Sequence, residues 1–153
     1  ILKITLRKTP SASSDFFVYN KRMKKSLLLK SFAVLILLFI VHLIGLKFYL
    51  YWDLRWFDSV AHFLGGLSVG LFSIWVLFVS GIFGKHHPTK KQIFFSSIVC
   101  GMLVGTGWEI FEYVYHIANP IGSYQVDTTF DLLADFVGAV VAGWIGRTRA
   151  YYE

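Results

Sequence analysis

Ionisable residues and cysteine are both scarce in this sequence. Only 16% of the 153 residues are charged, whereas 56% are hydrophobic, and a soluble domain of this length has a more polar composition. The single cysteine, Cys100, excludes an internal disulfide framework and a metal site built from several cysteines. The low content of charge therefore favours an integral membrane protein.

Long apolar runs are what the sequence contains instead. A transmembrane helix needs roughly 20 mostly apolar residues, and short polar segments separate four such runs. We predict an all-α polytopic membrane protein, a single bundle of four transmembrane helices at residues 26–149. The predicted spans cover about residues 32–52, 58–80, 92–115 and 127–147.

The two ends of the chain are expected to lie outside this bundle. Residues 1–25 are polar and lack helical periodicity, so we interpret them as a flexible arm, and residues 150–153 form a tail. The chain begins with Ile, and Met23 looks like a natural start, which leaves open whether residues 1–22 are native. At the start of the fourth span, Asp127 is expected to cap the helix.

Basic residues predict the orientation of the bundle. The sequence has 15 Lys and Arg residues, and membrane proteins concentrate such residues on their cytoplasmic flanks. All except Lys47 and Arg55 precede the first span, separate the second from the third, or follow the fourth. Both termini are therefore expected to be cytoplasmic. Membrane topology thus accounts for the basic residues behind the net charge of +6, so nucleic acid is not an expected partner.

Acidic residues gather at the opposite, outer end of the predicted bundle. A rise of about 1.5 Å per residue places His62, Glu109 and Asp131 roughly 6 Å below the outer edge of the hydrocarbon core, and Asp135 about 12 Å below it. Residues three or four apart share a helix face, so Asp58 pairs with His62. The acids of this outer end are Asp53, Asp58, Glu109, Glu112, Asp127, Asp131 and Asp135.

Small residues continue the same helix faces inward. They let transmembrane helices approach closely, which is expected to bring the acids into a shared pocket. The same glycine-rich faces are candidates for contacts within a homo-oligomer. The residues concerned are Gly66, Gly70, Gly101, Gly105, Gly138 and Ala142.

Clustered carboxylates need compensation inside a membrane. They repel one another when ionised, so they share protons, bind a cation or face water, and Lys47 and Arg55 are the only basic residues at the outer end. For Asp58 and Asp127, helix capping is an equally good explanation. Glu112 is long enough to reach the interface. The other clustered residues carry the functional hypothesis.

Three short motifs follow one another within residues 56–146. They are Phe57-Asp-Ser-Val-Ala-His-Phe-Leu-Gly-Gly66, Trp108-Glu-Ile-Phe-Glu112 and Asp127-Thr-Thr-Phe-Asp-Leu-Leu-Ala-Asp-Phe-Val-Gly-Ala139. In this order they resemble the YjdF-like family of uncharacterised bacterial inner-membrane proteins and, more distantly, the VanZ-like family. VanZ-like proteins have Gln and Asn where this chain has Glu112 and Asp135, which favours the YjdF-like assignment. The resemblance implies a location in the bacterial inner (plasma) membrane and membership of a family without an established activity.

A metal-dependent membrane hydrolase acting on a lipid or envelope precursor is the leading functional hypothesis. His and carboxylate ligands suit Zn, Mn or Fe, and oxygen ligands alone suit Mg. A bound metal can turn water into a nucleophile with a spare carboxylate as general base, and we assign Glu112 or Asp135 to that role. The metal ligands assigned are His62, Glu109 and Asp131, with Asp58 and Asp127 as further candidates.

Two other classes of function stay open. Asp127, Asp131 and Asp135 form a stripe that could pass protons or cations inward in a transporter or relay, although Gly, Ala and Val dominate below Asp135. Alternatively, the acids hydrogen-bond within a structural or partner-binding protein. Membrane lipid is the expected partner in each case, and the hydrolase hypothesis adds a lipid-linked substrate.

Overall fold

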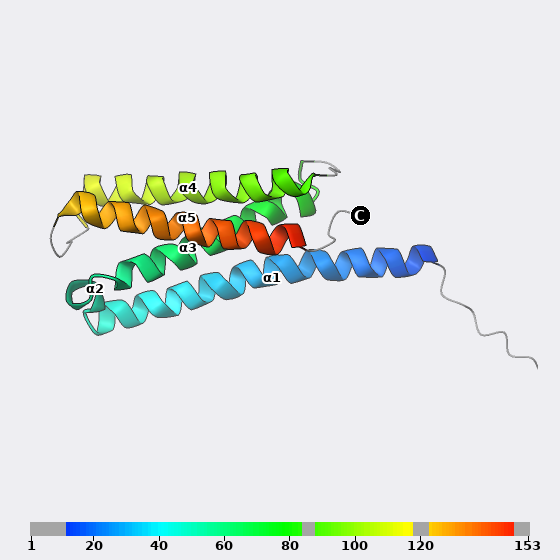
Figure 1. Ribbon diagram of the computed structural model, residues 1–153. Helices are drawn as coiled ribbons and strands as arrows, with labels where there is room; N and C mark the ends of the chain where they lie inside the picture. The colour runs from blue at the N-terminus through cyan, green and yellow to red at the C-terminus, as the bar shows by residue number, and fades with distance from the viewer. Residues whose placement is uncertain (1–11, 84–87, 118–122, 149–153) are drawn as a thin grey trace, which may run out of the picture.

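Helices make up all the regular structure in the described part of the chain. The computed structural model describes residues 12–83, 88–117 and 123–148, with side chains from residue 26 onward (Figure 1). This confirms the predicted all-α fold over these residues. The elements are α1 (Ala12–Lys47), α2 (Leu50–Asp53), α3 (Phe57–Ile74), the π-helical turn η1 (Trp75–Val79), α4 (Lys90–Tyr115) and α5 (Tyr124–Thr148).

Four segments are long and apolar enough to cross a membrane, as predicted. Only 11% of the most apolar part of the first is buried, against 50% for the second, so α3 is the central helix and α1 the most peripheral. Large apolar side chains cover the exposed faces of all four, which is typical of a surface in contact with lipid. The segments are Ser26–Lys47, Phe57–Val79, Lys90–Tyr115 and Tyr124–Thr148. The orientation of the bundle stays a prediction.

The N-terminal part of α1 differs from the sequence-based expectation. We expected an arm without regular structure at residues 1–25, whereas α1 already begins at Ala12. The sequence from Ala12 to Ile44 contains neither proline nor glycine, so nothing in it interrupts the helix that the apolar span propagates. Residues 1–11 of the expected arm and the expected tail at 150–153 lie outside the described residues.

The first span ends earlier than predicted. α1 stops at Lys47, and Tyr49 adopts the left-handed conformation with a φ of 58°, which commonly terminates a helix. The short helix α2 then carries Tyr51 and Trp52 back towards α3. The predicted end at Trp52 was wrong because apolar composition alone does not reveal this turn.

The start of α5 also corrects a prediction. The helix begins at Tyr124, and the backbone N–H of Asp127 already donates to the carbonyl oxygen of Ser123. Asp127 therefore lies in the first turn instead of at the N-cap, where its negative charge still favours the helix dipole. By contrast, α4 has a capping box in which Thr89 and Gln92 satisfy each other's backbone N–H groups.

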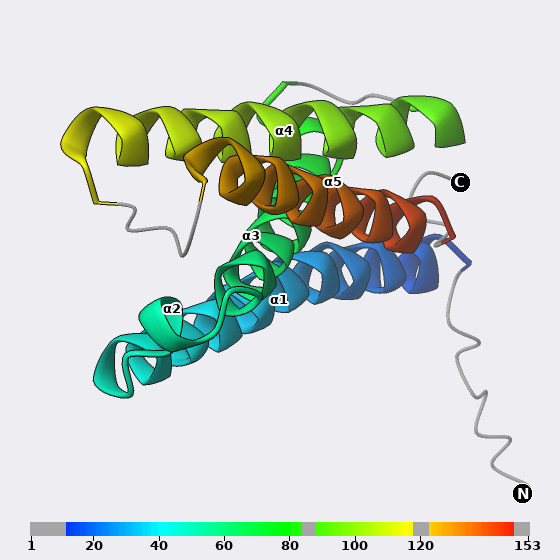
Figure 2. The same ribbon diagram turned by 60° about the vertical axis from the view of Figure 1, so that its left-hand side comes forward.

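Close packing around α3 depends on the predicted small residues. α3 packs against α1, α4 and α5, and Figures 1 and 2 place α1 and α4 on opposite sides of α3 and α5. A methyl group added at Gly66 would overlap the backbone of Asp135, and one at Gly138 would overlap the carbonyl of Phe63. Glycine thus brings the α5 acids directly against α3, as predicted. Homo-oligomer contacts through glycine stay a prediction, and these two glycines pack within the chain.

We expect Gly66→Ala to destabilise the protein and Gly107→Ala not to. The new methyl group at position 66 meets the backbone of Asp135, which cannot move aside alone, and overpacking of this kind costs about 1–3 kcal/mol. Gly107 also lies within a helix, but no described atom beyond its two chain neighbours and the backbone of its own helix lies within 4 Å of the added methyl group. Thermal unfolding in detergent measures the difference. Equal melting temperatures for the two variants would contradict close α3–α5 packing.

Candidate functional site

The chemistry-bearing residues gather at one end of the bundle. The start of α3 supplies Asp58 and His62, the end of α4 supplies Glu109 and Glu112, and the first three turns of α5 supply the remaining acids. These three helix ends lie together in Figure 1. Because α3 and α5 run opposite to α4, residues far apart in the sequence reach one level.

His62 is buried, and one of its ring nitrogens is fixed by Asp135. The distance from His62 Nδ1 to Asp135 Oδ2 is 2.9 Å, and the two residues are 6% and 3% exposed. An ionised carboxylate only accepts hydrogen bonds, so opposite an ionised Asp135 the hydrogen lies on Nδ1. Such a bond sets the tautomer and orientation of a histidine and leaves Nε2 free to bind a metal.

The other ring nitrogen of His62 faces two carboxylates. Its Nε2 lies 3.5 Å from Glu109 Oε1 and 3.9 Å from Asp58 Oδ1. Glu109 is 5% exposed, and its Oε1 has no hydrogen-bond partner among the described residues. A buried carboxylate oxygen without a partner is costly. Glu109 is therefore one of the residues that could offer an oxygen to a metal ion.

Asp131 is held in place by Ser59, which was not among the predicted site residues. The hydroxyl of Ser59 donates to Asp131 Oδ1 over 2.8 Å, and Asp131 is only 2% exposed. Ser59 lies three residues before His62 on α3, which puts both on one helix face. That spacing was the available signal, but a serine beside Asp58 is equally typical of a helix start.

Three overlapping sets of side chains can offer ligand atoms to a metal. In each set the atoms all lie within 4.8 Å of one another, and the set of His62, Glu109 and Asp131 is wholly buried. Two atoms bound to one Zn at roughly 2.1 Å lie within about 4 Å of each other. The 3.5 Å between His62 and Glu109 fits such an ion. The other sets are Asp58, His62 and Glu112, and Asp58, Asp127 and Asp131.

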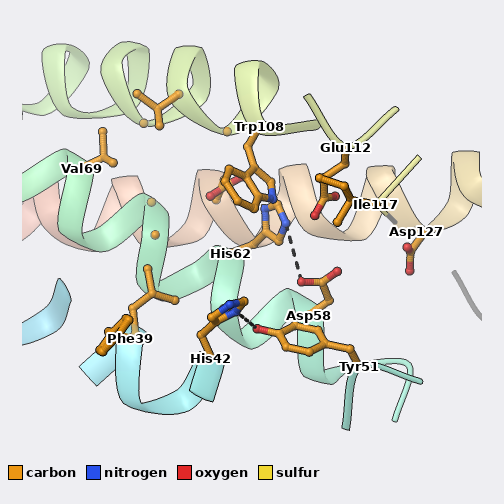
Figure 3. A pocket seen from close by; sticks show the side chains of 18 of the residues that line it. Phe39, His42, Tyr51, Asp58, His62, Val69, Trp108, Glu112, Ile117 and Asp127 are labelled. Atoms are coloured by element: carbon orange, nitrogen blue, oxygen red, sulfur yellow. Dashed lines mark hydrogen bonds and ion pairs between the residues drawn. The ribbon is translucent and has the colours of Figure 1, made fainter. Parts of the chain in front are cut away.

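A cavity of about 670 Å³ opens beside this cluster. Figure 3 shows Asp58, His62 and Glu112 around its polar part, with Asp127 further out. Glu109 and Asp131 do not line the cavity, whereas Asp58, His62 and Glu112 do. The cluster therefore has a buried part suited to holding an ion and a part that a substrate can reach.

Tyr51 and His42 form a second polar pair on the cavity wall. His42 Nδ1 lies 2.9 Å from the Tyr51 hydroxyl, and both residues line the cavity (Figure 3). Partial burial, together with the negative charges of Asp58 and Glu112, raises the pKa of Tyr51 to about 12. The phenol is therefore protonated at neutral pH and can donate a hydrogen bond. Tyr51 was not among the predicted site residues, because Tyr and Trp are common at the ends of transmembrane helices, where they lie at the membrane–water interface.

Comparison with known protein families gives a match over residues 16–150, to the family described as predicted membrane protein (DUF2238). The chain belongs to this family. The YjdF-like assignment is consistent with it, whereas the VanZ-like resemblance is unsupported. No curated protein and no solved structure matches the chain.

For this DUF2238 protein, function therefore has to be argued from the site itself. The sequence predicted seven site residues, and the structure brings all of them to one end of the bundle. Asp53, which the sequence grouped with them, lies on α2 and belongs to none of the three metal-ligand sets. The seven are Asp58, His62, Glu109, Glu112, Asp127, Asp131 and Asp135.

Proposed function

We propose that this chain is a metal-dependent membrane hydrolase that acts on a lipid or envelope precursor. His62, Glu109 and Asp131 are its proposed metal ligands, and Glu112 is its proposed general base. Mixed nitrogen and oxygen ligands favour Zn, Mn or Fe over Mg. Asp58 and Asp127 stand at the cavity side of the same cluster, where they can hold a second or displaced ion.

The arrangement of His62 and Glu109 supports this proposal most directly. Nε2 of the buried His62 faces, at 3.5 Å, a buried Glu109 oxygen that accepts no hydrogen bond among the described residues. The three ion pairs at this site all use His62, so one imidazole stands against several carboxylates. A divalent cation compensates that excess of negative charge better than a single proton on His62 does.

The substrate side of the site supplies the remaining chemistry. A bound divalent cation would make water more acidic and polarise the bond to be cleaved. Glu112 lines the cavity and has a ligand-capable oxygen within 4.8 Å of a ring nitrogen of His62. From that position it can take the proton of an attacking water molecule. For Asp135, the alternative base, we propose instead that it orients His62, because its Oδ2 lies 2.9 Å from His62 Nδ1.

A relay is the second candidate, and one observation favours it. His62 Nε2 lies 3.9 Å from Asp58 Oδ1 and its Nδ1 lies 2.9 Å from Asp135 Oδ2, so a proton could pass between these carboxylates through the imidazole. Beyond Asp135, however, the buried residues of α5 are Gly138, Ala139 and other small residues. The next hydroxyl, that of Ser97, already donates to the carbonyl oxygen of Ala139. The hydrolase is therefore the better supported proposal.

Protein purified without chelator is expected to hold about one equivalent of Zn, Mn or Fe, and His62→Ala is expected to lose it. Removal of one of three protein ligands also removes the stabilisation that the bound ion gives, worth about 2.7 kcal/mol at a hundredfold excess over Kd. His42→Ala is the matched control, because His42 lines the same cavity but belongs to no metal-ligand set.

Elemental analysis and melting temperatures measure both variants. The parent protein is expected to melt at a higher temperature after addition of the metal it holds, and His62→Ala is expected not to respond. Absence of a stoichiometric metal, combined with no stabilisation by Zn, Mn, Fe or Mg, would remove the basis of the proposal.

A further inference from the structure

The cavity beside the cluster continues far along the bundle as an apolar groove. Its walls come from helices on opposite sides of α3, and Figure 3 shows Phe39 and Val69 at the end away from Asp127. We name it the α1–α4 groove. Its apolar walls are Leu35, Leu38 and Phe39 of α1, Val69 of α3, and Gly101 and Val104 of α4.

The length of the α1–α4 groove matches one leaflet of a bilayer. Val69 follows Asp58 by 11 residues, and Gly101 precedes Glu112 by the same number. Eleven residues of helix span roughly 16 Å, about half of a ~30 Å hydrocarbon core. The groove thus extends from the polar cluster to near the middle of the membrane.

The groove is open to lipid and has a suitable size for a ligand. Phe39 and Val104 line it and are 59% and 54% exposed. Its volume of about 670 Å³ falls within the ~300–1,000 Å³ typical of ligand sites. Since both walls lie within membrane-spanning segments, the molecules that surround them are hydrocarbon chains.

The polar end of the groove carries one positive residue. Arg55 lines it, is exposed and takes part in none of the ion pairs of the site. Asp127 lines the same cavity. With a divalent cation at His62, this end would present two positive groups, the ion and the guanidinium, to a headgroup. Guanidinium and metal ions are common ligands of phosphate oxygens.

From this geometry we infer that the α1–α4 groove binds one hydrocarbon chain of a phosphate-bearing lipid, with the phosphate between Arg55 and the metal site. This inference rests on the proposed function, because the metal supplies part of the attraction for phosphate. It names the substrate class of the hydrolase and makes Arg55 a specificity-determining residue. The hydrogen-bonded pair of Tyr51 and His42 lines the same cavity.

Photocrosslinking in vesicles tests the inference. The parent protein is placed in phosphatidylcholine vesicles that contain a trace of phosphatidic acid or of diacylglycerol, each with a photoactivatable group on one acyl chain. Crosslinks identified by mass spectrometry are expected on α1 and α4 at the groove walls. Phosphatidic acid is expected to label them about tenfold more than diacylglycerol, which corresponds to one charge-assisted contact.

Three variants make the test specific. Val104→Trp fills the groove and should reduce its labelling about tenfold. Val99→Trp is the matched control, because Val99 is also 54% exposed on α4 but does not line the groove. Arg55→Gln should remove most of the preference for phosphatidic acid while leaving the labelling by diacylglycerol unchanged.

The metal content of each preparation separates the two proposals. Labelling spread evenly over all lipid-facing residues, or equal labelling by both lipids, in protein that holds its metal would overturn the inference and leave the proposed function intact. Groove labelling that prefers phosphatidic acid in protein without metal would instead support a lipid site that depends on Arg55 and overturn the metal-dependent hydrolase.

Discussion

Glu112→Gln is expected to retain the bound metal and to lose hydrolysis by about 10²–10⁴-fold, the usual contribution of a general base. Glutamine keeps the size of the side chain and one oxygen but does not accept a proton at neutral pH. The buried ligands His62, Glu109 and Asp131 are unchanged by this substitution. The ion should therefore remain while the step that activates water fails.

Glu109→Gln is the matched comparison, since it makes the same chemical change one helical turn away. This variant is expected to lose both the metal and the activity, because the unpartnered Oε1 of Glu109 is the proposed ligand atom. Vesicles that contain phosphatidic acid provide the substrate, and mass spectrometry of the lipids measures its cleavage at any ester bond. Elemental analysis measures the metal in the same samples.

The opposite pattern of metal loss would reassign the site. If Glu112→Gln lost the metal and Glu109→Gln kept it, the ion would be held by the cavity-facing set of Asp58, His62 and Glu112. Undiminished lipid cleavage in both variants would contradict the roles assigned to the two residues, and absence of cleavage by the metal-loaded parent protein would contradict the hydrolase. The pair of variants thus distinguishes a wrong ligand assignment from a wrong class of function.

The sequence was sufficient to predict the helices that cross the membrane and the meeting of their polar groups. Apolar length predicts spans because lipid requires each backbone polar group to bond within its own helix. His62, Glu109 and Asp131 were matched in depth by a constant rise per residue. The small residues Gly66 and Gly138 indicated helix contact, and both do lie against a neighbouring backbone.

The sequence was insufficient to predict which side chains contact each other, because those contacts depend on how the helices are rotated and connected. Nothing in the spacing of α5 distinguishes Asp131, which bonds Ser59, from Asp135, which bonds His62. The turn at Tyr49 bends the chain so that Tyr51 meets His42, and composition gives no sign of it. The groove between α1 and α4 likewise arises from helices that are neighbours of α3 but not consecutive in the chain.

Asp135 provides the sharpest separation between the hydrolase and the relay. Its Oδ2 lies 2.9 Å from His62 Nδ1, within hydrogen-bond distance, and the absence of side chains at Gly66 and Gly105 leaves room for it. Loss of an orienting partner of a metal-bound histidine commonly costs about 10–100-fold in metal affinity or activity. Asparagine retains an oxygen that accepts the same hydrogen bond, whereas alanine does not.

For the hydrolase, Asp135→Asn is therefore expected to retain most of the metal affinity, and Asp135→Ala to lose about 10–100-fold of it. If Asp135 orients His62, asparagine should bind metal more tightly than alanine at this position. If Asp135 is only structural, the two substitutions should change the melting temperature but should not differ in metal affinity.

For a relay, both substitutions remove the group that carries the proton, so pH-driven flux into proteoliposomes should stop equally in both. The decisive measurements are metal titration and proton flux on the same three proteins, the parent and the two variants. Robust flux in the parent that Asp135→Asn abolishes, with metal affinity unaffected by either change, would replace the hydrolase by the relay.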